Sequence, residues 1–378
     1  MRRKLLFLTG TRADFGKLEP LALAARDRGH AVTFFVTGMH MLDRYGATRN
    51  EVQRLEGIGK AEFINQRIGD PQDVILAKTI IGLSDWVNEN RPDLAVVHGD
   101  RIEALAGALV SATNYIRCAH IEGGEVSGTI DEVYRHCNTK LCTYHFVSSD
   151  AARSRVIALG EDPVTVFNIG SPELDFHHGP SGVSLDEVRQ RYDIHFPDYG
   201  IAVFHPVTSE RDTIGAQAAS LFAALSDSGR SFVVISPNND PGSEDIFAEI
   251  ERLDPARFRH LPNMRFAYFS ELMKNAAALV GNSSAGVREA PFLGIPSLNI
   301  GTRQLNRSAA PTITEASAFD RARIEDFLST RWGQRFASDR SFGQGQSAAR
   351  FVEILEQDSF WSVPLQKHFY GETRSDPI

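Results

Sequence analysis

The stretch KLLFLTGTRADFG (residues 4–16) decides the fold, because a short apolar run ends in a Thr-Gly pair and leads into a helical pattern. Residues 4–8 predict a buried strand, and about residues 15–28 predict the helix that follows it. Residues 31–36 are rich in β-branched and aromatic side chains and end in a second Thr-Gly pair. Short apolar strands that alternate with helices are typical of βαβ units and of a parallel sheet buried on both faces.

The same alternation continues along the chain in two blocks. In the first block, strands are predicted at 94–97, 117–121, 145–148 and 165–169, with helices at about 74–90 and 104–113. Residues 176–198 contain HHGPSG and most of FPDYG, which is the pattern most typical of a linker in this chain. In the second block, strands are predicted at 200–205, 231–236, 259–260, 277–280 and 296–300, with helices at 214–225, 243–253 and 269–275.

These two blocks predict an α/β protein with two doubly wound, Rossmann-like domains. The length of 378 residues agrees, because it exceeds what one hydrophobic core usually serves. We place the first domain at residues 1–175, the second, nucleotide-binding domain at 176–358 and a C-terminal tail at 359–378.

The composition excludes several classes of protein. With 42% hydrophobic and 23% charged residues, the chain is an ordinary globular protein and neither disordered nor fibrous. Forty Lys and Arg residues against 48 Asp and Glu residues give a formal net charge of −8, which disfavours a nucleic-acid binder. A local basic pocket for one small anionic ligand stays compatible with that charge.

Membrane and targeting segments are not expected. The N-terminal apolar run is cut by Thr9, Gly10 and Arg12, and the weakly polar stretch 104–112 has about half the length of a membrane-spanning helix. Three cysteines are too few, and odd in number, for a disulfide framework: Cys118, Cys137 and Cys142. We therefore expect a reduced, cytoplasmic protein.

Polar and charged residues gather where the predicted strands end. In open α/β sheets, ligands bind beyond the carboxyl ends of the strands. Five such groups occur, at residues 9–12, 98–101, 120–125, 205 and 281–284. We expect one cleft between the two domains to gather them.

The segment GNSSAG (residues 281–286) lies between a predicted strand and a helix predicted to begin near Val287. Small residues and two hydroxyls before a helix N-terminus suit the binding of a phosphate. The same residues also suit an ordinary turn and helix cap. The segment is neither a dinucleotide fingerprint nor a P-loop, because no Gly-Lys-Ser/Thr follows. Glu289 suits a contact with a ribose and equally suits a solvated helix surface.

Several carboxylates follow two of the predicted strands. Asp100 and Glu122 each come just after a strand end, with His98 and His120 nearby and with further acidic residues close behind: Glu125, Asp131 and Glu132. Carboxylates and imidazoles gathered at one sheet edge have shifted pKa values and suit acid and base catalysis. The alternative is that these carboxylates are solvated or cap helices and that Asp100 pairs with Arg101. His205 ends a strand of the second block and is either structural or catalytic.

Four soft ligands lie within ten residues: His136, Cys137, Cys142 and His145. Their spacing matches no common zinc pattern, and the segment reads as a helix that turns into a strand. We therefore predict no metal site here.

Six segments together resemble one family, the hydrolysing UDP-N-acetylglucosamine 2-epimerases. The segments are TGTRADFGKLEP (9–20), VHGDRIEALA (97–106), HIEGGEVSGTIDEVYRH (120–136), HPVT (205–208), GNSSAGVREAP (281–291) and LNIGTRQLNR (298–307). The tail segment VPLQKHF (363–369) is similar to the end of family members as well. The family includes bacterial enzymes of sialic-acid synthesis and the epimerase half of a bifunctional animal enzyme.

The resemblance implies two Rossmann-like domains around a cleft, a GT-B-like fold, with a tail that packs on the first domain. It implies conversion of UDP-N-acetylglucosamine to N-acetylmannosamine and UDP, by elimination to 2-acetamidoglucal and then hydration. No metal or redox cofactor is implied. The expected partners are a nucleotide-sugar substrate and further copies of the chain in a dimer or tetramer, with no nucleic acid or membrane.

The resemblance also assigns roles to residues. Glu289 would contact the ribose and Asn238 the base region, and five residues would bind the rest of the nucleotide: Arg12, Arg101, Ser283, Ser284 and Arg303. His205 would contact the diphosphate or the leaving oxygen.

The acid and base groups would be Asp100, Glu122 and Asp131, with Glu122 or Asp131 moving the proton at C2. Relatives with other specificities keep alternatives open: a UDP-linked 2,4-diacetamido-trideoxy sugar, a GDP-linked counterpart, the non-hydrolysing epimerase reaction, a glycosyltransferase, or a nucleotide-sugar-binding protein without activity.

Overall fold

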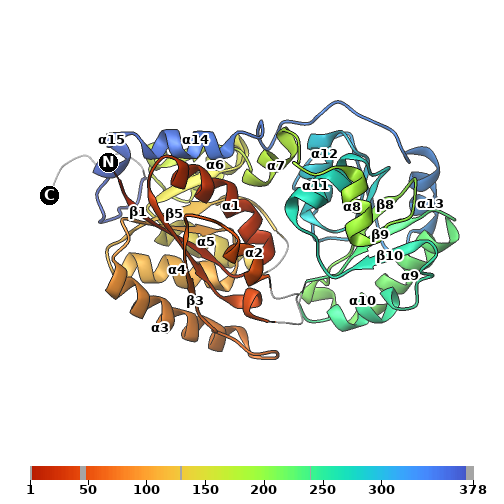
Figure 1. The fold of residues 1–378 in the computed structure, drawn as a ribbon, viewed down its shortest axis with the longest axis horizontal. Helices are drawn as coiled ribbons and strands as arrows, with labels where there is room; N and C mark the ends of the chain where they lie inside the picture. Colours follow the sequence, from red (N-terminus) through yellow and green to blue (C-terminus); the bar gives the residue numbers. More distant parts are fainter. Residues whose placement is uncertain (1, 43–47, 128–129, 239, 372–378) are drawn as a thin grey trace. The chain divides into compact units, whose positions relative to one another are not determined.

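The computed structural model describes residues 2–42, 48–127, 130–238 and 240–371 (Figure 1). The chain divides into two compact units. The first comprises Met1–Glu125, Ile130–Asp175 and Phe342–Ile378, and the second comprises Val126–Thr129 and Phe176–Ser341. Within the described ranges, no helix has both the length and the apolar character that crossing a membrane requires.

The first unit contains a seven-stranded parallel sheet in the order β3-β2-β1-β4-β5-β6-β7. Its strands are β1 Lys4–Thr9, β2 Ala31–Val36, β3 Gly59–Glu62, β4 Leu94–His98, β5 Arg117–Ile121, β6 Tyr144–Val147 and β7 Val166–Asn168. Its α-helices are α1 Arg12–Asp27, α2 Arg49–Gln53, α3 Gln72–Asn90, α4 Ile102–Thr113, α5 Asp131–Leu141, α6 Asp150–Ala158, α14 Ser347–Leu355 and α15 Asp358–Ser362. Short 3₁₀ turns lie at Gly38–Met41, Pro163–Thr165 and Pro172–Leu174.

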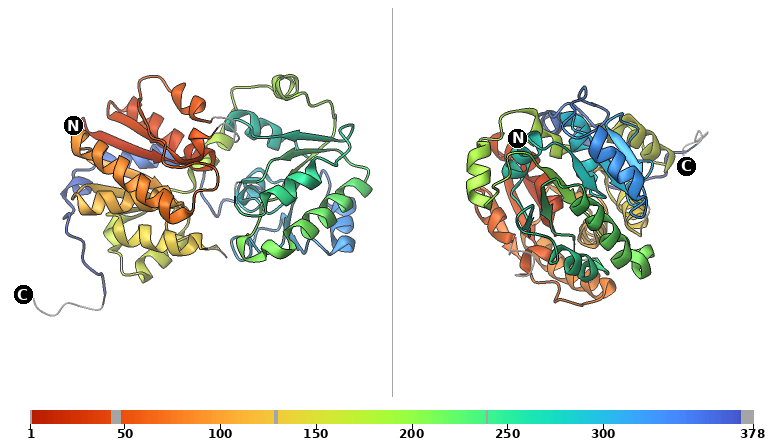
Figure 2. Two further views of the ribbon diagram at one scale, coloured as in Figure 1. Left: turned by 90° about the horizontal axis from the view of Figure 1, so that it is seen from below. Right: turned by 90° about the vertical axis from the view of Figure 1, so that its right-hand side faces the viewer.

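The second unit contains a six-stranded parallel sheet in the order β10-β9-β8-β11-β12-β13. Its strands are β8 Gly200–Val203, β9 Phe232–Ile235, β10 Phe258–Leu261, β11 Leu279–Gly281, β12 Ser297–Ile300 and β13 Ile313–Ala316. Its helices are α8 Leu185–Tyr192, α9 Ile214–Asp227, α10 Ser243–Ile250, α11 Phe266–Lys274, α12 Glu289–Leu293 and α13 Arg321–Thr330, with α7 Asp175–His178 at its start and 3₁₀ turns at Thr208–Thr213 and Ser284–Gly286. Figure 2 shows that helices flank both sheets. The predicted α/β class with two doubly wound domains is confirmed.

Each sheet has one place where the strand order reverses. In the first unit this place lies between β1 and β4, where Leu5 pairs with Leu94. In the second unit it lies between β8 and β11, where Val203 pairs with Gly281. Connections leave the two strands in opposite directions there, and in sheets of this kind ligands bind beyond the carboxyl ends of the strands at that position. Each unit therefore has its own position at which a ligand is expected to bind.

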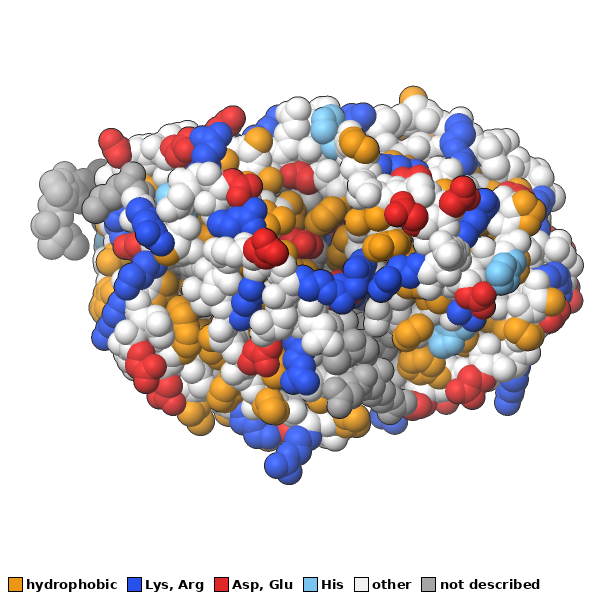
Figure 3. Space-filling view, viewed as in Figure 1, with side chains coloured by type: hydrophobic (Ala, Val, Ile, Leu, Met, Phe, Trp, Pro, Cys, Tyr) orange, Lys and Arg blue, Asp and Glu red, His pale blue; other side chains and the backbone are white. Residues whose placement is uncertain are grey.

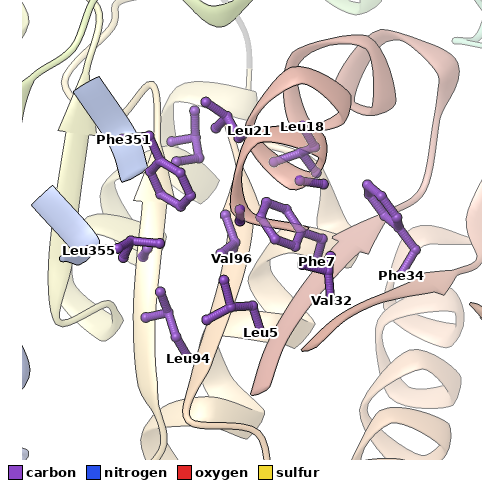
Figure 4. Packing of buried hydrophobic residues seen from close by; sticks show 14 of the residues in the cluster. Leu5, Phe7, Leu18, Leu21, Val32, Phe34, Leu94, Val96, Phe351 and Leu355 are labelled. Atoms are coloured by element: carbon purple, nitrogen blue, oxygen red, sulfur yellow. The ribbon is translucent and has the colours of Figure 1, made fainter. Parts of the chain in front are cut away.

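The last helices of the chain complete the core of the first unit. Phe351 and Leu355 of α14 pack among Leu5, Phe7 and residues of β4 and α1 (Figure 4). The rings of Phe351 and Phe7 meet edge to face with centroids 6.3 Å apart. Burial of two such side chains is worth several kcal/mol, about 2 each. This packing explains why Phe342 onward belongs to the first unit, whereas the sequence predicted that the second domain extends to residue 358.

Several elements were not predicted, among them α6 and α13, and three further examples show why. The edge strands β3 and β13 are half-exposed and lack a continuous apolar run, which hides them from pattern analysis. The interval predicted to be a linker contains α8, so that prediction is wrong for residues 185–192. The helix begins with a capping box in which Ser184 and Glu187 exchange hydrogen bonds.

Candidate active site

The turn after β1 is closed by its own side chains. Thr11 caps α1, and the buried carboxylate of Asp14 accepts hydrogen bonds from the amides of Gly10 (3.0 Å) and Thr11 (3.1 Å) and from the hydroxyl of Thr9. Burial raises the pKa of Asp14 to about 6, against the lowering effect of these donors. The amides at this turn are therefore already occupied by a carboxylate.

Arg12 and Arg101 each lie next to a helix start at the reversal of the first sheet. Arg12 is the first residue of α1 and is half-buried, with Nε 3.7 Å from Oε2 of Glu51. Arg101 is the N-cap residue of α4, with Nε 3.9 Å from Oε2 of the buried Glu103. Both guanidinium groups are thus placed beside the carboxyl ends of β1 and β4.

Glu122 lies directly after β5 in a buried cluster of charged groups. Its φ of +60° is in the left-handed region, and its amide donates to the carbonyl of Phe146 (2.8 Å). Its Oε2 accepts from Nζ of Lys17 (2.8 Å) and lies 3.1 Å from Nε2 of His98, and its Oε1 accepts from the hydroxyl of Ser171. These contacts fix the orientation of a carboxylate whose side chain is only 4% exposed.

Two further groups set the charge of this cluster. Lys17 also lies 3.0 Å from Oε2 of the buried Glu173, so one ammonium is shared by two carboxylates. Burial lowers the pKa of His98, against the raising effect of Glu122. His98 is therefore neutral at pH 7 and donates its Nε2–H to Glu122. Lys17 and His98 thus hold the Glu122 carboxylate in one orientation within the cluster.

Asp100 and Asp131 are joined through helix α5. Asp131 is the first residue of α5, and Arg135, one turn later, contacts the carboxylate of Asp100. Arg135 is buried and also donates to the carbonyl of Glu125 (3.0 Å). The partner of Asp100 is thus Arg135, and the alternative in which Asp100 pairs with Arg101 is not seen among the described contacts.

The carbonyl of Gly99 is a second connection between these elements. It accepts from Nδ2 of Asn138 on α5 (3.0 Å) and from Nε2 of His120 on β5 (2.8 Å). Burial lowers the pKa of His120 to about 3, so its ring is neutral and serves as a structural donor. Helix α5 therefore ties the loop after β4 to the loop after β5, and three predicted carboxylates gather at one sheet edge: Asp100, Glu122 and Asp131.

In the second unit, His205 and Asn282 meet at the reversal of the sheet. Oδ1 of Asn282 accepts from the amide of His205 (2.6 Å), and its Nδ2 donates to the carbonyl of His205 (2.8 Å). Nδ1 of His205 accepts from the amide of Asn238 (3.0 Å), so the neutral ring carries its proton on Nε2. Burial lowers the pKa of His205 to about 3, with a smaller effect from Arg303. His205 is thus a neutral N–H donor near the carboxyl ends of β8 and β11.

Ser283 and Ser284 follow β11 as predicted, but the helix after them is short. A three-residue 3₁₀ turn covers Ser284–Gly286, and α12 spans only Glu289–Leu293, whereas the sequence predicted a helix from about residue 287. The Oγ of Ser283 lies 3.4 Å from the amide of Ala285. A helix this short has a weak dipole, so hydroxyls and backbone amides are the main donors here. Arg303 lies beside them and donates to the carbonyl of Asn282 (3.2 Å).

Glu289 is buried and belongs to a chain of polar side chains. Its Oε1 lies 2.9 Å from Nε2 of His177, and Nδ1 of His177 lies 2.8 Å from the hydroxyl of Ser270. The interpretation of Glu289 as a solvated helix charge is therefore wrong, because the residue is only 4% exposed.

Three residues of these sites were not predicted, Lys17, Arg135 and His177, and Asn282 was predicted only as part of the segment 281–284. Arg135 follows Asp131 by four residues, a spacing that places both on one helix face and offered a signal. No local sequence signal pointed to Lys17, because its partner Glu122 lies 105 residues further along the chain and Glu173 lies further still.

Three of the four side chains considered as metal ligands have other contacts, and the fourth, Cys137, is an exposed free cysteine. His145 pairs with Glu161 (3.0 Å), His136 lies 3.9 Å from Glu132, and Cys142 packs against Cys118. The three cysteines are free thiols. Among the residues that the structure describes, no group of three or more His, Cys, Asp or Glu side chains is arranged to hold a metal ion.

Charged side chains lie both on the surface and in the interior. Figure 3 shows side chains of both signs on the visible face, with several basic side chains adjoining one another near its middle. Some cationic side chains are buried, among them Lys17, Arg135 and Arg288. Buried carboxylates outnumber these cations, so the interior contributes to the net charge of −8: Asp14, Glu103, Glu122, Glu125, Glu161, Glu173 and Glu289.

Two doubly wound sheets, each with polar groups at its strand reversal, define a two-domain Rossmann-type protein whose sites suit acid–base chemistry on a small anionic ligand. The sequence profile described as UDP-N-acetylglucosamine 2-epimerase matches residues 23–356. The chain belongs to this family.

Two relatives extend over nearly the whole chain. A UDP-N-acetylglucosamine 2-epimerase of Neisseria meningitidis serogroup B is 41% identical over 97% of this chain and 98% of its own. A UDP-N,N'-diacetylbacillosamine 2-epimerase (hydrolyzing) of Legionella pneumophila is 30% identical over 97% of this chain and 99% of its own. Among solved structures, UDP-GlcNAc 2-epimerase of Methanocaldococcus jannaschii in complex with UDP-GlcNAc and UDP has a TM-score of 0.78 at 18% identity, covering 93% of this chain and 99% of the other. That likeness confirms the fold.

Proposed function

We propose that this protein is a hydrolysing UDP-N-acetylglucosamine 2-epimerase, which converts UDP-N-acetylglucosamine and water to N-acetylmannosamine and UDP. The observation that carries the proposal is the buried Glu122 carboxylate, bonded to Lys17 and to neutral His98 beside Asp100 and the start of α5. The 41% identical relative supports the substrate, and the hydrolysing relative at 30% identity supports the use of water.

The first step is an elimination. A carboxylate, Glu122 or Asp131, accepts the proton from C2 of the sugar while the bond between C1 and the diphosphate oxygen breaks. The products are 2-acetamidoglucal and UDP. C2–H is a weak acid, so its removal needs a carboxylate that is oriented by fixed donors, which is the environment of Glu122.

The leaving diphosphate needs fixed donors and positive charge. In the second unit, His205 offers a neutral Nε2–H, and Arg303 and the hydroxyls of Ser283 and Ser284 lie beside it. In the first unit, Arg12 and Arg101 supply positive charge at the strand reversal. Donors that are already in place stabilise developing charge without a cost of reorganisation. Glu289 is assigned to the ribose and Asn238 to the base region.

The second step adds water across the double bond. The hydroxyl goes to C1 and a proton returns to C2 from the opposite face, which gives N-acetylmannosamine. Asp100, held by Arg135, and Asp131 are the carboxylates assigned to this step with Glu122. Coupled carboxylates share their titration, so the three act as a set. The reaction needs no metal or redox cofactor, and we place the enzyme in the cytoplasm as a homo-oligomer.

The test is a reaction in D₂O followed by NMR. Incubation of the purified protein with UDP-N-acetylglucosamine is expected to release UDP together with N-acetylmannosamine that carries deuterium at C2. Release of UDP without deuterium at C2 would contradict the elimination. Formation of UDP-N-acetylmannosamine in place of the free sugar would identify the non-hydrolysing reaction.

A second candidate substrate follows from the relatives. The 30% identical protein of Legionella pneumophila is named for UDP-N,N'-diacetylbacillosamine, and a 27% identical protein of Campylobacter jejuni is named for GDP/UDP-N,N'-diacetylbacillosamine. The same NMR assay with UDP-linked and GDP-linked diacetamido sugars ranks these substrates by kcat/KM. We expect UDP-N-acetylglucosamine to rank first.

A further inference from the structure

The C-terminal segment places one lysine at the carboxyl end of helix α5. Nζ of Lys367 donates to the carbonyls of Thr139 (2.7 Å), Lys140 (3.0 Å) and Cys142 (2.6 Å). Carbonyls in the last turn of a helix have no partner within the helix, and the partial negative charge there favours a cation. One ammonium group therefore caps α5 from a position more than 220 residues further along the chain.

The segment around Lys367 is attached to the first unit on both sides. Before it, Nη2 of Arg117 donates to the carbonyl of Trp361 (2.7 Å). After it, the amide of Tyr370 donates to the carbonyl of Gly160 (2.8 Å), and Nζ of Lys140 lies 5.4 Å from the ring of Phe369. The lysine is thus held in place by its flanking chain, and its position does not depend on its own contacts alone.

A buried carboxylate, that of Glu161, favours the protonated form of Lys367. Glu161 has a fully buried side chain and accepts from Lys140 (2.7 Å), from His145 (3.0 Å) and from Lys367. Burial alone would raise the pKa of Glu161, but hydrogen bonds from these three partners hold it at about 2. Burial lowers the pKa of Lys367, and the Glu161 carboxylate opposes that effect.

The other end of α5 carries groups of the candidate active site. Arg135 contacts Asp100, Asn138 donates to the carbonyl of Gly99, and Asp131 is the first residue of the helix. The helix rises about 1.5 Å per residue, so a shift by a fraction of one turn displaces all of these contacts together. A cap at one end of such a rigid element fixes the position of the other end.

We propose that Lys367 is a positioning residue: it anchors α5 and thereby sets the position of Asp131 and of the Arg135–Asp100 pair. The C-terminal segment VPLQKHF (363–369) then contributes to the active site by holding Lys367 against the end of α5. The effect on turnover rests on the proposed function, in which Asp100 and Asp131 act on the sugar, whereas the effect on α5 does not.

The experiment compares three full-length variants. Lys367→Met removes the charge and the donors, and Lys367→Arg keeps the charge but spreads its donors over a planar group. Lys274→Met is the matched control, because Lys274 is also half-buried and donates to one carbonyl, that of Gly179 (2.7 Å), in the second unit. Hydrogen exchange by mass spectrometry is measured on peptides covering α5, together with kcat and KM for UDP-N-acetylglucosamine.

For Lys367→Met we expect faster exchange in α5 and unchanged exchange in the second unit. We expect kcat to fall at least about tenfold, since small displacements of catalytic groups cost up to about 100-fold, while KM changes by less than about twofold. Lys367→Arg is expected to recover part of kcat, and Lys274→Met to leave kcat and α5 exchange as in the wild type.

Three outcomes would overturn the proposal. They are unchanged exchange in α5, unchanged kcat, and faster exchange throughout the first unit, which would mark a general loss of stability. If Lys367→Met does not fold, Lys367→Gln is measured instead, because its amide keeps two neutral donors. If the wild type turns over no nucleotide sugar, the proposed function fails, and the exchange of α5 alone decides whether Lys367 anchors the helix.

Discussion

Replacing Asn282 by alanine removes the side chain that joins the ends of β8 and β11. The side chain is buried, and it pairs with both the amide and the carbonyl of His205, at 2.6 and 2.8 Å. Each backbone group left without a partner in a buried position costs about 1–3 kcal/mol. Since His205 is half-buried and water reaches it in part, we expect a loss of about 2–4 kcal/mol in the free energy of unfolding of the second unit.

The assay must report on the second unit alone, because a chain with two units does not unfold in one step. Trp332 packs against Phe232 in that unit, with ring centroids 5.5 Å apart. In a background with Trp86→Phe and Trp361→Phe, Trp332 fluorescence during urea unfolding follows the second unit.

The matched control for this prediction is Asn299→Ala. Asn299 is as buried as Asn282, but its side chain donates to the carboxylate of the exposed Glu315 (2.6 Å), which water can solvate after the change. We expect this control to cost less than about 1.5 kcal/mol. If Asn282→Ala costs no more than Asn299→Ala, the assignment of Asn282 as the connection between the two strands is wrong.

Three further predictions concern Gly281 at the end of β11, the buried His120 and the carboxylate of Glu122. Gly281→Ala is expected to prevent folding of the second unit, because its φ is +131° and a Cβ atom would lie 2.0 Å from the carbonyl oxygen of Val203. The control is Gly301→Ala, where φ is +76° and the nearest atom is 3.9 Å from the added Cβ; we expect it to cost only about 1–2 kcal/mol of unfolding free energy. Soluble yield and circular dichroism of the two variants are compared. The pKa of His120 is lowered from 6.5 to about 3 by burial, so the unfolded chain binds more protons and stability falls as the pH drops below 6.5. Between pH 6 and 5, the free energy of unfolding of His120→Asn should depend on pH less steeply than that of the wild type, by about 1.4 kcal/mol per pH unit. Urea unfolding measures both slopes, and equal slopes for the two proteins would refute the assignment. Glu122→Gln should keep UDP binding in calorimetry and lower kcat by at least about 100-fold, and wild-type turnover would show that Glu122 moves no proton.

The central strands of both sheets are predictable from sequence because they are buried on both faces. Residues 31–36 and 94–97 form continuous apolar or β-branched runs, and each lies in a strand within one residue of the prediction. Edge strands have no such signal, since β13 (Ile313–Ala316) buries none of its residues completely. The helix α8 was hidden by the Gly and Pro residues before it, although its Ser-x-x-Glu capping box was legible.

The sites were predictable where they depend on strand ends. Asp100, Glu122 and His205 lie within two residues of a strand end, and parallel sheets place such residues at one edge. The contacts that orient them were not predictable, because they join distant parts of the chain. Lys17 meets Glu173 across 156 positions, and no local pattern encodes a buried pair of that separation.

The division of the chain has a consequence for its synthesis. Residues 176–341 form the second unit almost without interruption, whereas the first unit lacks the core side chains Phe351 and Leu355 until the last part of the chain is made. At about 5–20 residues per second, the second unit leaves the ribosome complete while the first still has an open apolar surface over Phe7. Residues 342–360 therefore complete the core of the first unit only after the whole second unit has been synthesised.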